Sequence, residues 1–140
     1  LIIDGTDNLD YFNYKFNISK QYQKRMKFIK NFFFNKNKEN KFNTTNLWKI
    51  FYKFGKDSLF DVLNYQLFTS KNIDKKIIEH LNFFKDKSIP IFPIKGHTLI
   101  KKFGIPEGEK IGENLKLIEN FWLDNNFKIS EKDLKRIVKH

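Results

Sequence analysis

Residues 19–34, SKQYQKRMKFIKNFFF, carry apolar side chains at intervals of three and four. These intervals place the apolar side chains on one side of an α-helix, which has 3.6 residues per turn. The positions concerned are Tyr22, Met26, Ile29 and Phe33. Ser19, directly before the helix, is a residue type that commonly caps helix N-termini. No segment shows the period of two that marks a half-buried strand, so the sequence predicts an all-α fold.

The same reasoning extends along the chain in both directions. Residues 4–17 show no sustained period and are predicted to be an irregular lead-in, and the Lys- and Asn-rich segment 35–43 is predicted to be an exposed loop. The further predicted helices are 44–54, 57–69, a helix from 74, 97–103, 108–125 and 130–139. Their predicted core positions are Leu47, Phe51, Phe54, Phe60, Leu63, Leu67, Ile77, Ile78, Leu81, Phe84, Ile111, Leu115, Ile118 and Trp122. About seven helices in an irregular bundle or array are expected.

Several residues are predicted to begin or end these helices. Thr44 or Thr45 is expected to cap the second helix, and Gly55 to end it in a left-handed conformation. The remaining caps are expected at Asp57, Asp74 and Ser130, the last forming a capping box with Asp133.

Residues 89–94, IPIFPI, are predicted to be extended, because each proline disfavours a helical conformation in its predecessor and removes a backbone donor. Their four bulky apolar side chains are expected to lie across the helices as a strap, near 89–95. This segment divides the predicted organisation into a helical body region, 1–88, and a strap with a helix–turn–helix tail, 89–140.

Composition limits the classes of function. The chain has 140 residues with 27 Lys and Arg against 16 Asp and Glu, a formal net charge of +11, which favours polyanionic partners. Part of this charge reflects a Lys-, Asn-, Ile- and Phe-rich composition typical of A/T-rich codons, since only Arg25 and Arg136 are arginines.

The absence of cysteine excludes disulfides and thiolate sites and fits a cytoplasmic location. No apolar run is long enough to cross a membrane. Because the first residue is Leu1 rather than Met, we expect a piece of a longer protein.

A search for catalytic residues finds none. No glycine-rich loop is followed by the Lys-Ser or Lys-Thr pair of a nucleotide-binding loop. The three histidines are too dispersed to form a metal site, and the three aspartates near the start lack the Gly and Glu of a calcium loop. These residues are His80, His97 and His140, and Asp4, Asp7 and Asp10. Asp57 and Asp61 are expected to be an exposed pair on one helix, so neither a catalytic nor a metal site is predicted.

Residues 95–112, KGHTLIKKFGIPEGEKIG, form the densest motif. A tight turn between two helices would present the first backbone N–H groups of the second helix to a phosphate. Lysines would add charge and glycines would let another backbone approach closely. The predicted phosphate-binding residues are Lys95, Gly96, Lys101, Lys102, Gly104, Gly108, Lys110 and Gly112. In the structural alternative Gly104 caps a helix, Pro106 starts the next and Gly112 allows close helix packing.

Residues 89–127 resemble the C-terminal end of bacterial CCA-adding tRNA nucleotidyltransferases and the related poly(A) polymerase family. The resemblance rests on ordered motifs: FPIKG at 92–96, Leu99-Ile100, GIPxGxxIG at 104–112, Leu115, Glu119, Phe121-Trp122 and Asn126-Phe127. Upstream, residues 16–19 and 52–63 are more loosely similar to earlier helical elements of the family. The similar region of the family is its body and tail, which contact the elbow and acceptor side of tRNA.

The resemblance implies that a catalytic head, which binds magnesium with CTP or ATP, would precede this region. The head's Asp-x-Asp metal pair is not matched by Asp4, Asp7 and Asp10, whose spacing is three. We therefore expect a non-catalytic, cytoplasmic fragment that needs no cofactor, is inactive alone, and binds tRNA backbone in tRNA 3′-end processing.

The sequence is also compatible with two other functions. The chain is expected, alternatively, to be a helical interaction module that docks on a separate catalytic head or neck chain, or a helix-hairpin module that binds nucleic acid through the 104–112 turn. A continuous lysine surface favours RNA binding, and scattered lysines favour the scaffold.

Overall fold

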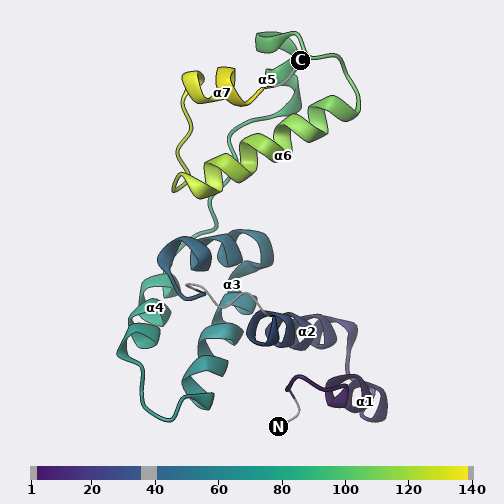
Figure 1. Cartoon of the computed structure of the whole chain (residues 1–140), viewed down its shortest axis with the longest axis vertical. Coiled ribbons are helices and arrows are strands. Elements are labelled where there is room, and N and C mark those ends of the chain that lie inside the picture. The colour runs from purple at the N-terminus through teal and green to yellow at the C-terminus, as the bar shows by residue number, and fades with distance from the viewer. Residues whose placement is uncertain (1–2, 36–40, 139–140) are drawn as a thin grey trace. The chain divides into compact units, whose positions relative to one another are not determined.

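The protein is all-α, as predicted. A computed structural model describes residues 3–35 and 41–138, and these contain seven helices and no strand (Figure 1). The chain divides into two compact units, Leu1–Ile89 and Pro90–His140.

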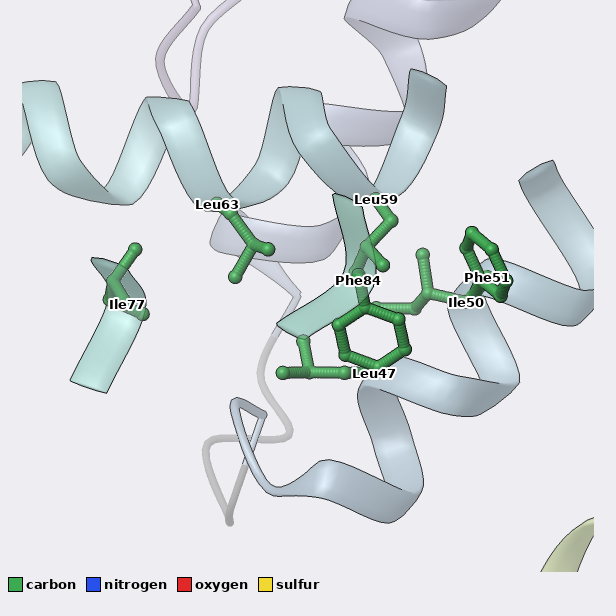
Figure 2. Packing of buried hydrophobic residues seen from close by; sticks show 7 residues of the cluster. All are labelled: Leu47, Ile50, Phe51, Leu59, Leu63, Ile77 and Phe84. Atoms are coloured by element: carbon green, nitrogen blue, oxygen red, sulfur yellow. The ribbon is translucent and has the colours of Figure 1, made fainter. Parts of the chain in front are cut away.

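The first unit is built around a bent central helix. It contains α1 (Asn8–Lys15), α2 (Lys20–Phe34), α3 (Thr44–Thr69) and α4 (Lys75–Lys85). Both α2 and α4 pack on α3. Figure 2 shows the core between α3 and α4, where the Phe84 ring lies among aliphatic side chains of α3. The buried cluster consists of Leu47, Ile50, Phe51, Leu59, Leu63, Ile77 and Phe84.

Gly55 breaks α3, as its sequence position predicts. Its φ of +84° and ψ of 173° are open to glycine and disfavoured for other residues, so the helix bends there. Two core predictions are wrong. Phe54, next to the bend, is 54% exposed, and Tyr22 of α2 is 56% exposed. The α3–α4 core takes Phe51 before the bend and Leu59 after it, whereas the Phe54 ring lies against Phe28 of α2.

Other core predictions need smaller corrections. Phe60, Leu67 and Leu81 are half-buried and pack on the outside of the cluster. Ile78 is 38% exposed because its neighbour Ile77 takes the core position.

The N-terminal lead-in is a helix, contrary to the prediction of irregular structure. In α1 only Leu9 and Asn13 are buried, so its eight residues carry too few core positions to show a period. The cap of α3 also differs. Asn43, rather than Thr44 or Thr45, accepts a hydrogen bond from the backbone N–H of Asn46 at 2.7 Å. The remainder of the predicted 35–43 loop, residues 36–40, lies outside the described residues.

An ion pair joins α2 to α3. Arg25 donates from Nε and Nη2 to the two carboxylate oxygens of Asp61, both at 2.7 Å, and its Nη1 lies 3.7 Å from Asp57. The hydrogen bonds to Asp61 raise the pKa of Arg25. Asp61 is therefore half-buried and structural, which corrects the expectation of an exposed carboxylate pair.

The second unit contains α5 (Gly96–Phe103), α6 (Glu109–Asp124) and α7 (Glu131–Ile137). Its core comprises Leu99, Ile105, Ile118, Trp122, Leu123 and Leu134. Ser130 and Asp133 form the predicted capping box of α7. The predicted continuation of this helix to 139 ends on a residue outside the described range.

The proline segment contains neither helix nor strand, and only part of it covers helices. Phe92 and Ile94 pack on the core of the second unit, but Ile91 is 89% exposed. Ile89 is 45% exposed and belongs to the first unit. The expectation that all four apolar side chains lie across the helices is therefore wrong, because alternate side chains of an extended segment point in opposite directions.

Candidate nucleic-acid interface

The turn between α5 and α6 is shaped by two glycines and one buried isoleucine. Gly104 has φ +65° and caps α5 in the left-handed conformation, and its N–H donates to the Ile100 carbonyl at 3.0 Å. Gly108 has φ +132° and precedes α6. Ile105 is buried and fixes the turn to the core. Pro106 lies in the turn and does not start the next helix, because α6 begins at Glu109.

The structure places all eight predicted phosphate-binding residues in the second unit. Lys95 precedes α5, Lys101 and Lys102 lie in its last turn, and Lys110 is the second residue of α6. All four lysines are exposed. A Cβ added to Gly104 or Gly108 would meet nothing within 4 Å, so the backbone of the turn is open to a ligand.

Acidic side chains reduce the positive charge around this turn. Lys102 Nζ lies 2.5 Å from Glu131 Oε1, and this contact lowers the pKa of Glu131. Glu107, Glu109 and Glu113 are exposed at the start of α6. Among the described residues, no carboxylate lies within ion-pair distance of Lys95, Lys101 or Lys110. These three lysines are therefore available to an anionic partner, whereas Lys102 must first leave Glu131.

The close approach of α5 and α6 depends on a different glycine from the one predicted. A Cβ on Gly96 would lie 3.0 Å from Ile111 Cγ2, so Gly96 allows α5 to approach α6 closely. A Cβ on Gly112 would meet nothing within 4 Å, so the prediction that Gly112 permits close helix packing is wrong. Gly96, and not Gly112, allows the close approach of α5 to α6.

Alanine substitutions at these two glycines are expected to shift stability in opposite directions. Gly96→Ala is expected to destabilise the second unit by about 1 kcal/mol, because Ile111 must move. Gly112→Ala is expected to stabilise it by about 0.5–1 kcal/mol, because alanine restricts the unfolded chain and suits a helix interior. Urea unfolding of both variants measures the two shifts, and shifts of the same sign would contradict this assignment.

The described residues contain no group of three or more His, Cys, Asp or Glu placed to hold a metal ion. His80 is half-buried and His97 is exposed, while His140 lies outside the described range. Asp4 accepts hydrogen bonds from Thr6 and Asn8, which lower its pKa.

Most of the positive charge lies in the first unit, which contains none of the predicted phosphate-binding residues. Residues 1–89 carry 17 Lys and Arg against 9 Asp and Glu, a formal charge of +8 out of +11. In α2, Lys20, Lys24 and Lys27 are exposed and repeat at the same intervals as the apolar positions. No acidic residue occurs in α2. This periodicity of lysines was the signal that could have identified α2 as a basic surface.

None of the helices in the described parts of the chain is both long and apolar enough to cross a membrane. No protein-family model, curated protein or solved structure matches the chain.

Proposed function

We propose that this chain is the non-catalytic C-terminal portion of a CCA-adding tRNA nucleotidyltransferase-like protein and binds the tRNA backbone. The observation that supports this proposal is the set of exposed lysines before α5, in its last turn and at the start of α6, of which Lys95, Lys101 and Lys110 have no carboxylate partner among the described residues. The order of motifs along residues 89–127 supports the choice of tRNA.

The proposed contacts recognise phosphate rather than sequence. The first backbone N–H groups of α6 and the lysine ammonium groups each attract one phosphate oxygen. Duplex RNA is recognised largely through its phosphates and 2′-hydroxyls, and this needs no side chain that reads a base edge. The magnesium, CTP and ATP of the related enzymes would belong to a catalytic region outside this sequence.

Removal of Glu131 tests the role of Lys102. In Glu131→Gln, Lys102 no longer has to leave an ion pair before it contacts phosphate, so the Kd for tRNA is expected to fall by up to about fivefold, the range of an exposed pair. Fluorescence anisotropy with labelled tRNA measures the change. Glu79→Gln removes an exposed charge from α4 of the first unit and is the matched control. An equal gain in both variants would show a general charge effect and would contradict the assignment.

A second candidate function is docking on a separate catalytic chain. It is favoured by Phe68, which is 86% exposed, and Ile73, which is 77% exposed, since single large apolar side chains at this exposure suit burial by a partner. Docking through these residues predicts an affinity that depends weakly on salt, in contrast to tRNA binding.

A further inference from the structure

A groove between α2 and α3 combines one exposed and one half-buried aromatic ring with lysines that have no carboxylate partner among the described residues. It has a volume of about 500 Å³. Its lining includes Lys24, Arg25, Lys27, Phe28, Lys53 and Phe54. This groove lies in the first unit and contains none of the residues proposed above to bind tRNA.

The aromatic floor of the groove is formed by Phe28 and Phe54. Their ring centroids are 4.4 Å apart with an interplanar angle of 35°. Phe54 remains 54% exposed, although the unit has a core that buries Phe51 and Phe84 completely. Gly55 follows Phe54 directly and bends α3 at this point, and Phe54 is not among the buried residues of the α3–α4 core. The fold thus leaves part of the Phe54 ring exposed to solvent on α3.

All the charged side chains that line the groove are cationic. No carboxylate is found among the described residues that line the groove. Two acids of α3 lie next to the groove, at Arg25, which is one of its lining residues. Asp61 accepts a hydrogen bond from Arg25 at 2.7 Å and Asp57 lies 3.7 Å from the same guanidinium, so both carboxylates face this arginine. Lys24, Lys27 and Lys53 are exposed and have no carboxylate within ion-pair distance in the described part of the chain. The Arg25 contacts therefore leave three lysines for an external anion.

From this arrangement we infer that the α2–α3 groove binds single-stranded nucleic acid, with an unpaired base stacked on Phe54 and adjacent phosphates on Lys24, Lys27 and Lys53. A single strand offers flat apolar faces and negative charges, and the groove offers a ring face and positive charges. A duplex hides its base faces in the helical stack and cannot offer them to Phe54. The formal charge of +8 on residues 1–89 would attract the strand to this unit.

Binding of a fluorescent eight-nucleotide oligouridine to the full chain tests this inference, with an abasic strand of equal phosphate count as the comparison. Phe54→Leu keeps an apolar contact with Phe28 but removes the aromatic face. It is expected to weaken oligouridine binding by at least about fivefold and to leave abasic-strand binding unchanged. Phe68→Leu, at an exposed phenylalanine of the same helix outside the groove, is the matched control and should change neither.

Replacement of Lys24, Lys27 and Lys53 by Gln should weaken both strands and flatten the plot of log affinity against log salt by about two units, at about 0.7 for each phosphate on a single strand. The matched control replaces Lys71, Lys75 and Lys76 by Gln, which removes the same charge from exposed positions of the same unit. Equal binding of the two strands, equal effects of the two lysine sets, or tighter binding of an oligoglutamate peptide would overturn the inference. Lysine and glycine variants of the α5–α6 turn lie in the other unit, so failure of the tRNA proposal would not alter these results.

Discussion

Trp122→Ala is expected to cost about 3–5 kcal/mol and to unfold most of the second unit at room temperature. Trp122 is 3% exposed, and its ring meets Phe92 and Phe127 at centroid distances of 5.3 and 4.8 Å. It therefore joins the segment before α5, the helix α6 and the segment after it. A unit of this size has a total stability on the order of 3–8 kcal/mol, so the loss is comparable with the whole.

The effect should be confined to one unit. The chain has two tryptophans, and Trp48 packs on Phe51 and Phe84 in the first unit. In Trp122→Ala the fluorescence of Trp48 is expected to keep its native wavelength while circular dichroism loses the helical signal of α5 to α7. Trp122→Phe preserves most of the apolar volume and should cost less. A Trp122→Ala chain that unfolds at the urea concentration of the unsubstituted chain would contradict the burial of Trp122.

Local signals in the sequence predicted much of the fold. The intervals in 19–34 predicted α2, and the capping box at Ser130 predicted the start of α7, because both depend on residues within one or two turns. Gly55 and Gly104 were predicted to end helices because their conformations are costly for other residues. The short helix α1 was missed because two buried positions are too few to show a period.

Contacts between distant residues could not be predicted in this way. Asp61 is 36 residues from Arg25 and Glu131 is 29 residues from Lys102, so neither pair leaves a pattern in a local window. The first pair places Asp61 at the α2–α3 contact. The second reduces the charge of a predicted phosphate ligand. Phe54 likewise lies against Phe28, 26 residues away on α2, and periodicity along α3 does not contain that information.

Four lysines of residues 95–110 are expected to control how tRNA binding depends on salt. If Lys95, Lys101, Lys102 and Lys110 each neutralise one phosphate, log affinity should fall with log salt at a slope of about −3 to −4, since each contact on a duplex contributes about −0.9. Lys101→Gln should flatten this slope by about one unit. Preference among tRNA sequences should not change, because a phosphate contact carries no sequence information.

Lys102 is expected to behave differently from Lys101 because of its ion pair. With Glu131 at 2.5 Å, Lys102 already has a counter-charge and should release less salt on binding, so Lys102→Gln alone should flatten the slope by less than one unit. In a Glu131→Gln background the same substitution should give the full unit. The double variant Lys101→Gln, Lys102→Gln should approach two units in that background, while Lys75→Gln, Lys76→Gln, an adjacent exposed pair on α4, should not alter it. An unchanged slope in the α5 double variant would leave the α5–α6 turn with a packing role alone and would favour docking on a catalytic chain.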